Sequence, residues 1–425
     1  MNRKFLDNYF FLLFSIIPIT IILGPAVSLI NVLLIDLSFI LFLLYKKNYQ
    51  FLSNRIVKLI LLLCLYLIFN SIIAQNFAMG FLRNFGFIRF GIFFCAFNYF
   101  FYYHKSFHKI LIVWTVSLII LCLDVYIESY FGKNILGYGG VEYGGRIVSF
   151  FKDELVAGAY LNTFFLIITG YLFFINEKSS GKYRNIILII STIFLIGIFL
   201  TGERSNSIKA LFGFIIFYVI SDDFKTKEKL FSTLLIFVIV ISFFSNSEFL
   251  KFRFGEQLVK PIYSMSLRIL NISSSSKEIK DKNKFENSTY IQIYKSGFSV
   301  FKNNLIFGVG NKNYRLETCN NIKNNSSYWC TTHPHQTYFE FLAEHGLLGT
   351  IVLLLILFNL IFGKIKRIYE SKNYIQIGCF IFLATTFIPF LPSGSFFNDS
   401  NLTFFWINLS LMYAVNKKTN IFFSN

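Results

Sequence analysis

Long apolar runs separated by short polar segments extend along most of the chain. Many of these runs have about 16 to 20 residues, the length that an α-helix needs to cross the core of a bilayer. We count twelve of them: 9–24, 26–45, 59–75, 85–103, 110–128, 155–175, 185–201, 207–221, 230–246, 346–363, 375–391 and 401–416. The pattern predicts an all-α polytopic membrane protein with about twelve transmembrane helices.

The composition agrees with a membrane protein. Of the 425 residues, 55% are hydrophobic and 20% are aromatic. Charged residues make up 15%, against roughly 25% in soluble domains. The first apolar run follows Arg3 and Lys4, as a signal peptide would, but the second run follows at once. We therefore expect an uncleaved first membrane helix.

The basic residues of the connecting segments predict the orientation. One set of segments holds 20 Lys and Arg residues; it comprises 1–8, 46–58, 104–109, 176–184, 222–229, 364–374 and 417–425. The short loops on the opposite side hold only Arg83, Lys133, Arg146, Lys152 and Arg204. Because cytoplasmic loops are enriched in Lys and Arg, we expect both termini in the cytoplasm, which an even number of spans allows.

One long hydrophilic segment, 247–345, interrupts the apolar pattern. It separates the first nine predicted helices, within 1–246, from the last three, within 346–425, and the orientation places it outside the cytoplasm. We expect one integrated membrane domain that carries this large external loop. Its 13 basic and 8 acidic residues suit an anionic partner such as a diphosphate, although the run 277–284 is more simply a solvated stretch.

Aromatic and small residues recur at helical spacing in the second half of this loop. They are Tyr290, Ile293, Tyr294, Gly297, Phe298 and Phe301. They predict a helix that lies along the membrane surface or caps the spans. Farther on, Cys319 and Cys330 could form a disulfide in an external loop, whereas the other cysteines lie in apolar runs. No CxxC or HExxH pattern occurs, so we expect no metal and no cofactor.

Histidines and carboxylates gather in 332–349, directly before an apolar run. Pro334 favours the start of a helix, so we expect His335 in the first helical turn. The positive potential of a helix N-terminus favours a neutral imidazole, which could accept a proton from an attacking hydroxyl. His333 and His345 compete for this role, and His345 is more simply a residue at the helix start. A histidine that only bonds loop backbone is the alternative.

Arginines in two short external loops could bind an anion. Arg204 lies in a very short turn between two apolar runs, and a guanidinium can bind phosphate oxygens in a bidentate manner. The alternatives are an arginine that only extends to the membrane interface and an ion pair with Glu203. Arg146 follows two glycines that would let the backbone approach a ligand closely, and Lys152, Asp153 and Glu154 follow it; this loop could equally be a plain connection.

Several of these segments together resemble the O-antigen ligase and polysaccharide polymerase superfamily. The matching segments are His335-Gln336 with Gly346 and Gly349, the turn 201–205, the glycine-rich stretch 307–310 with Tyr314-Arg315, and the loop 146–154. The resemblance covers about 140–365, and the first third of the chain matches in topology only. It implies a GT-C-like membrane fold in the inner membrane of a bacterium, with the large loop and the active site in the periplasm.

The resemblance also implies an activity: inverting, metal-independent transfer of a glycan from undecaprenyl diphosphate. Ligases transfer it to lipid A–core, and polymerases transfer it to another lipid-linked repeat unit; the histidine motif favours a ligase. By resemblance, His335 is the base and Arg204 binds the diphosphate. Arg146, Gln336 and His333 are expected to bind substrate.

The superfamily's ligases also use an arginine inside the large loop. The arginine-x-x-x-tryptophan form of this motif is absent here, because 288–294 contains neither residue. Arg268 is the first candidate to replace it, and Arg315 is the second.

Two other classes of protein remain open. A lipid-linked glycan flippase or transporter would also suit about twelve spans, although the chain shows no internal repeat of the kind that transporters contain. A non-catalytic scaffold of an envelope assembly complex is the other. We expect membrane lipids and glycolipid substrates as partners, and no nucleic acid.

Overall fold

The protein is described by a computed structural model. It describes residues 3–47, 49–103, 107–140, 143–178, 182–222, 224–259, 289–321, 325–389 and 391–423. Within these residues the secondary structure is helical and contains no strand. The protein is therefore an all-α protein, as the apolar pattern predicts.

The helices follow the predicted apolar runs closely. They are α1 (Arg3–Ser15), α2 (Ile17–Ile22), α3 (Pro25–Lys46), α4 (Arg55–Ile72), α5 (Phe77–Gly86), α6 (Ile88–Tyr103), α7 (Phe107–Phe131), α8 (Ala157–Lys178), α9 (Arg184–Leu200), α10 (Arg204–Ile220), α11 (Thr226–Asn246), α12 (Glu248–Leu250), α15 (Thr289–Asn303), α16 (Tyr314–Asn320), α17 (Thr337–Phe362), α18 (Ile365–Ser371), α19 (Tyr374–Thr386) and α20 (Asp399–Ala414). Short 3₁₀ segments η1 (Gln50–Ser53) and η3 (Ser149–Phe151) and a π-helix, η4 (Lys251–Val259), join them.

Six helical stretches in the described part of the chain are long and apolar enough to cross a membrane. They are Pro25–Lys46, Arg55–Ile72, Phe77–Phe101, Phe107–Phe131, Ala157–Glu177 and Thr337–Ser371. Arg184–Leu200 and Tyr374–Thr386 are shorter apolar helices. The chain is thus a multi-pass membrane protein, and the count of twelve spans stays a prediction. The first predicted run is broken between α1 and α2, where Pro18 lies in the first turn of α2.

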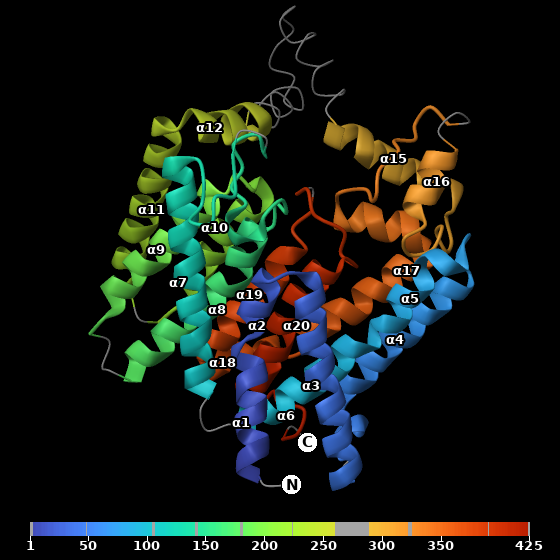
Figure 1. Ribbon diagram of the computed structural model, residues 1–425, viewed down its shortest axis with the longest axis horizontal. Coiled ribbons are helices and arrows are strands. Elements are labelled where there is room, and N and C mark those ends of the chain that lie inside the picture. Colours follow the sequence, from blue (N-terminus) through green and yellow to red (C-terminus); the bar gives the residue numbers. More distant parts are fainter. Residues whose placement is uncertain are drawn as a thin grey trace, which may run out of the picture.

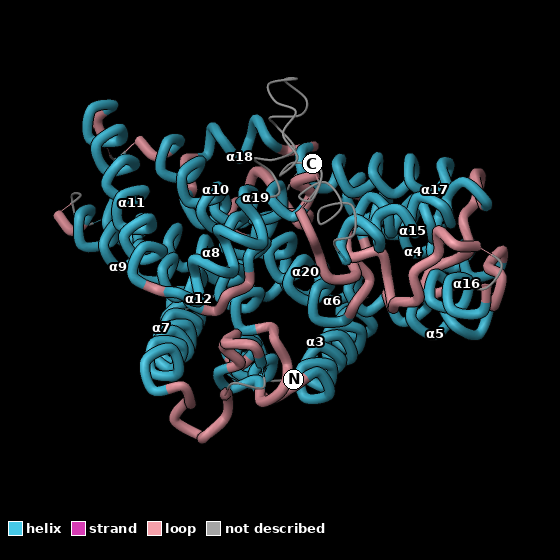
Figure 2. Tube along the Cα trace, turned by 90° about the horizontal axis from the view of Figure 1, so that it is seen from above, coloured by secondary structure: helices cyan, strands magenta, loops and turns pink. Residues whose placement is uncertain are grey.

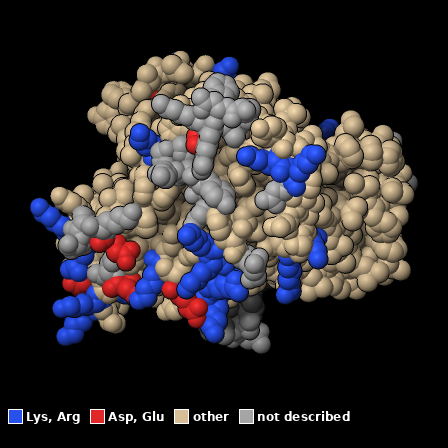
Figure 3. Space-filling model, turned by 90° about the horizontal axis from the view of Figure 1, so that it is seen from below, with Lys and Arg blue, Asp and Glu red and all other residues tan. Residues whose placement is uncertain are grey.

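Two helix pairs organise the buried core: α8 packs along α19, and α6 packs along α20. Figure 1 shows both chain ends at the lower end of the helix bundle, and α12, α15 and α16 at the opposite end. Seen from above, α15 and α16 lie on the side of α4, α5 and α17, whereas α12 lies near α7 to α11 (Figure 2). Figure 3 shows Lys and Arg side chains on the lower face, and the cytoplasmic orientation of the termini stays a prediction.

Helix α17 is kinked where the glycine-rich segment 305–310 packs against it. Gly346, at the kink, has φ 62° and ψ −169°, a conformation that favours glycine. A Cβ atom there would overlap the carbonyl of Ile306. Backbone hydrogen bonds join the two segments on both sides of the kink, from Val309 N to Ala343 O at 3.0 Å and from Leu347 N to Leu305 O at 2.8 Å. Gly346 therefore permits the close packing that its position predicts.

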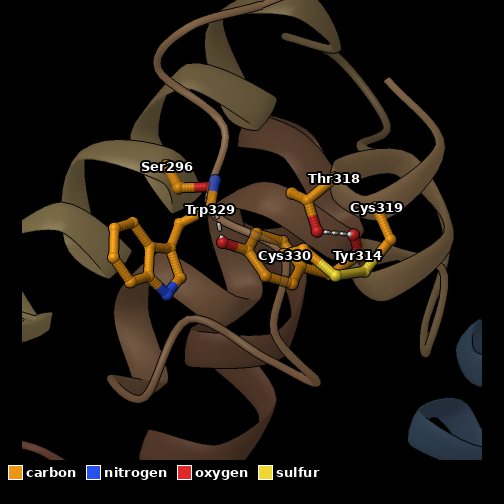
Figure 4. The surroundings of a disulfide bond; sticks show 6 residues. All are labelled: Ser296, Tyr314, Thr318, Cys319, Trp329 and Cys330. Carbon is orange, nitrogen blue, oxygen red and sulfur yellow. Dashed lines mark hydrogen bonds between the residues drawn. A yellow bond between two sulfur atoms is a disulfide. The ribbon is translucent and has the colours of Figure 1, made fainter. Parts of the chain in front are cut away.

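A disulfide joins Cys319, at the end of α16, to Cys330, which lies just before the histidine motif. Figure 4 shows its surroundings. Ser296 Oγ of α15 accepts hydrogen bonds from Tyr314 Oη at 2.8 Å and from Trp329 N at 2.9 Å. The disulfide and these bonds connect α15 and α16 to the segment that leads to His335.

Candidate active site

A cavity of about 700 Å³ collects most of the charged residues that the sequence analysis singles out. Its walls come from the loop 146–156, the start of α8, the turn before α10, η4, the first turn of α15, the segment before α17, the loop 392–398 and the start of α20. The ionisable side chains that line it are Arg146, Glu154, Glu203, Arg204, Lys209, Arg253, Tyr290, His335 and Asp399. Segments far apart in the sequence thus converge on one space.

The turn before α10 points Arg204 away from its neighbour Glu203. The Glu203 carboxylate is buried and accepts hydrogen bonds from Gly158 N at 2.8 Å and Asn206 Nδ2 at 2.7 Å. Burial raises the pKa of Glu203, and the positive charge of Arg146 opposes the shift. Arg204 Nη1 instead donates to the Gln257 carbonyl at 3.0 Å. In the described part of the chain, the ion pair with Glu203 that was left open as an alternative does not occur.

Arg253, which the sequence analysis did not select, lies beside Arg204. Its Nε and Nη2 atoms donate to the Gly202 carbonyl at 3.3 and 3.1 Å. Burial, and next the positive charges of Arg204 and Arg146, lower the pKa of Arg253 to about 10. Arg146 Nε is buried and has no hydrogen-bond partner among the described residues. Three guanidinium groups therefore share one cavity, and Arg146 Nε among them has no acceptor in the described part of the chain.

Lys209 adds a fourth cation to this wall. It lies on α10, five residues beyond Arg204, which corresponds to about 7.5 Å along a helix axis. Its side chain lines the same cavity, and no hydrogen bond or ion pair within the described residues engages its ammonium group. A lysine without a counter-charge is typical of a site that binds an anion.

His335 also lines the cavity, but it is not inside a helix. The expectation that it lies in the first helical turn is wrong, because Gln336 caps α17 by accepting a hydrogen bond from Phe339 N at 2.9 Å. The helix therefore begins at Thr337. His335 has φ 54°, and its carbonyl accepts a hydrogen bond from Ser393 N at 2.8 Å.

The imidazole of His335 is held in its neutral form. Burial lowers its pKa to about 4, and His333, with ring centroids 4.0 Å apart, adds to the shift. The helix N-terminus was expected to have this effect, whereas here burial is the main cause. Tyr290 lies between the base and the cations: its ring is 6.2 Å from that of His335, and the Arg204 guanidinium is 5.7 Å from its centroid.

A buried carboxylate holds the loop that positions His335. Glu340 accepts hydrogen bonds from Ser395 Oγ and, at 2.8 Å, from Phe396 N. Lys312 Nζ donates to Ser395 Oγ at 2.7 Å from the other side. Because Ser393 of the same loop bonds the His335 backbone, Glu340 is a positioning residue that the sequence analysis missed. The sequence contained a signal for this role, because an acidic residue in the first turn of an apolar helix, such as Glu340, needs buried partners.

The other residues that were predicted to bind substrate differ in where they lie relative to the cavity. Gln336 is buried, and its side chain is occupied as a helix cap, so it does not line the cavity. The ring of His333 lies against that of His335, and its Nε2 has no partner in the described part of the chain. Arg315 is exposed on α16, outside the cavity lining. Arg268 lies outside the described residues.

His345, which competed with His335 for the role of base, and Arg89 form structural contacts outside this role. His345 is fully buried and bonds the Tyr66 hydroxyl through Nδ1 at 3.1 Å. Arg89 forms an ion pair with Asp399 at 2.7 Å, at the start of α20. Arg83 lies 3.7 Å from the same carboxylate. Arg89 lies in an apolar run, where a charged side chain requires a partner, and Asp399 is that partner.

The arrangement places four cationic side chains and a neutral imidazole in one cavity, with an aromatic ring between them. Comparison with known proteins gives a matching family. A search among curated proteins finds no match. A family model described as O-antigen ligase matches residues 187–354, a region that contains Arg204, Arg253, Tyr290 and His335. Over this region the chain is similar to the O-antigen ligase family, which supports the resemblance found in the sequence.

Proposed function

We propose that the protein is a ligase that transfers a glycan from undecaprenyl diphosphate to lipid A–core on the periplasmic face of the bacterial inner membrane. The observation that carries this proposal is the convergence of Arg146, Arg204, Arg253 and His335 on one cavity. A glycosyl diphosphate needs positive charge at its leaving group and a base near the attacking hydroxyl, and these residues supply both. The match to the O-antigen ligase family model supports the reaction class.

The cations would bind the diphosphate of the donor. Arg146 Nε has no hydrogen-bond partner among the described residues, and Arg204 and Arg253 use only some of their N–H groups in hydrogen bonds to backbone carbonyls. Each hydrogen bond from a guanidinium to a phosphate oxygen contributes about 1.5–3 kcal/mol. The leaving diphosphate gains negative charge as it departs, so fixed cations stabilise the transition state more than the ground state.

His335 would take the proton of the acceptor. The hydroxyl oxygen bonds to the anomeric carbon, and the bond from this carbon to the diphosphate oxygen breaks with its electron pair on the leaving group. The hydroxyl proton passes to the imidazole of His335. A pKa of about 4 keeps the ring unprotonated at pH 7 before substrate binds. A bound diphosphate then favours the imidazolium by its charge, which strengthens the base when it is needed.

The test is transfer by the full-length protein in nanodiscs, with a glycan on undecaprenyl diphosphate as donor and lipid A–core as acceptor. His335→Ala and Arg204→Ala should each lower the rate by about 10²–10⁴-fold while thermal unfolding stays like that of the wild type. Arg315→Ala is the matched control, because Arg315 is exposed and lies outside the cavity.

Cells provide the second arm of the test. Loss of the gene should leave lipid A–core without O-chains, while long chains accumulate on undecaprenyl diphosphate. Core that carries a single repeat unit, with no long chains on either lipid, would overturn the ligase in favour of a polymerase. Full transfer by His335→Ala would overturn the assignment of the base.

A further inference from the structure

A second cavity, of about 370 Å³, adjoins the first. It lies between the end of α2, the start of α3, the start of α6, the segment 150–156 and the start of α20. The two cavities share six wall residues: Pro25, Glu154, Val156, Asp399, Ser400 and Phe404. A molecule in the second cavity therefore lies one side chain away from the first.

The wall of the second cavity is amphipathic. Its apolar part comes mainly from α2 and α3 and comprises Ile21, Ile22, Leu23, Ala26, Leu29 and Val32. Its polar part carries the cations Arg89 and Lys152 and the carboxylates Asp153, Glu154 and Asp399. An apolar wall suits hydrocarbon, and carboxylates accept hydrogen bonds from sugar hydroxyls. This combination suits a glycolipid.

The charges of the two cavities differ in sign. In the second cavity Arg89 is already paired with Asp399 at 2.7 Å, which leaves Lys152 against two further carboxylates. The first cavity has four cations against three carboxylates, Glu154, Glu203 and Asp399, whereas the second has two cations against three carboxylates. A diphosphate is therefore repelled from the second cavity relative to the first, and an uncharged sugar is not.

The shared wall connects the second cavity to the base. Asp399 and Ser400 begin α20, directly after the loop that ends at Asn398. The same loop holds the His335 backbone through Ser393 N and is fixed to α17 through Glu340. A hydroxyl that reaches past Asp399 from the second cavity thus arrives at the side of the first cavity where His335 lies.

We propose that the second cavity binds the acceptor glycolipid. Its hydrocarbon lies against α2 and α3, and its sugar hydroxyls bond to Glu154 and Asp399. The hydroxyl that is glycosylated extends past this shared wall and gives its proton to His335 as its oxygen bonds to the anomeric carbon. This inference rests on the proposed transfer reaction and adds the place from which the second substrate enters.

The test separates the two substrates by kinetics. Ala26 is exposed and lines the second cavity but not the first, so Ala26→Trp narrows one of them only. Val27, the next residue of α3, is 37% exposed and lines neither, so Val27→Trp is the matched control. We expect Ala26→Trp to raise the KM for lipid A–core by at least about tenfold, or about 1.4 kcal/mol, and to leave the Kd for undecaprenyl diphosphate unchanged. Val27→Trp should change neither value.

A labelling experiment keeps the test valid if the tryptophan variant does not fold. In Ala26→Cys the new thiol is accessible, whereas the free cysteines of the described residues are buried. Lipid A–core should slow its reaction with a maleimide, and undecaprenyl diphosphate should not. Val27→Cys should react at the same rate with and without either lipid.

Three outcomes would overturn the inference. They are an unchanged KM for the acceptor, an increased Kd for undecaprenyl diphosphate in Ala26→Trp, or protection of Ala26→Cys by undecaprenyl diphosphate alone. Each of them leaves the proposed reaction standing as long as His335→Ala is inactive. If wild-type protein transfers no glycan at all, the proposed function fails first.

Discussion

Replacing Arg253 with methionine should weaken the binding of undecaprenyl diphosphate and leave the fold intact. Arg253 lies in η4, where its side chain donates two hydrogen bonds to the Gly202 carbonyl and one to Gln257 Oε1. Its pKa is lowered to about 10 by burial and by the neighbouring Arg204 and Arg146. The cluster therefore costs free energy without an anion, and a bound diphosphate offsets this cost.

The magnitude follows from the contacts that would be lost. One hydrogen bond between charged groups contributes about 1.5–3 kcal/mol. Its loss corresponds to a Kd increase of roughly 10- to 150-fold. Methionine also removes the repulsion that Arg253 exerts on Arg146 and Arg204, so these two cations bind the ligand with less competition. We expect the lower end of the range, about tenfold.

The assay is a titration of undecaprenyl diphosphate into the full-length protein in nanodiscs at several salt concentrations. Arg253→Met should raise the Kd and flatten its dependence on salt, because one fewer cation meets the ligand. Arg253→Lys should recover part of the affinity, since it keeps the charge and loses the planar fork. Arg315→Met is the control. A Kd for Arg253→Met within about twofold of the wild-type value, with unchanged salt dependence, would refute the assignment.

Three further predictions concern selectivity, pH and the disulfide. Lys209→Met should raise the Kd for undecaprenyl diphosphate by more than it raises the Kd for undecaprenyl monophosphate, because Lys209 lies about one turn farther along α10 than Arg204. Equal losses of affinity for both ligands would contradict a contact between Lys209 and the second phosphate. Burial lowers the pKa values of His333 and His335 from 6.5 to about 4, so these two histidines bind more protons in the unfolded chain between these values. Their contribution to stability should fall as the pH decreases from 6.5 to about 4 and then level off, whereas Glu203, whose pKa is raised by burial, contributes with the opposite sign. Thermal unfolding measured against pH checks this, and His333→Gln should reduce the slope; an unchanged slope would contradict it. Replacing Cys319 and Cys330 by serine should destabilise α15 and α16 by up to about 3 kcal/mol, because the two cysteines are 11 residues apart. Thiol labelling of both cysteines in unreduced wild-type protein would show instead that no disulfide forms.

The helices could be predicted because length and apolar spacing are local signals. The run 26–45 becomes α3, Pro25–Lys46, and the run 110–128 becomes α7, Phe107–Phe131. The apolar run 346–363 begins well inside α17, because a capping side chain, Gln336, lets the helix begin in polar sequence. The kink at Gly346 then marks the place where the apolar run was predicted to begin.

The convergence of site residues could be predicted only in part. Arg204 and Arg146 were selected because they lie in short loops between apolar runs, and His335 because it belongs to a histidine cluster directly before an apolar run; all three line one cavity. Arg253 could not be selected in this way, because it is one of 13 basic residues in 247–345 and has no distinctive spacing. Only the path of η4 over the Gly202 carbonyl brings it to Arg204.

The two halves of the site come from different parts of the fold, and this division implies an order of events. The cations belong to the loop 146–156, α10 and η4, whereas His335 depends on α15, α17 and the loop before α20. Tyr290 touches both halves, through the Arg204 guanidinium and the His335 ring. Without an anion, buried His335 is a weak base because its pKa is about 4. In the proposed reaction, the donor diphosphate would bring the negative charge that raises this pKa, and an uncharged acceptor sugar would not. Under that proposal, the site would activate an acceptor hydroxyl only after the donor has bound.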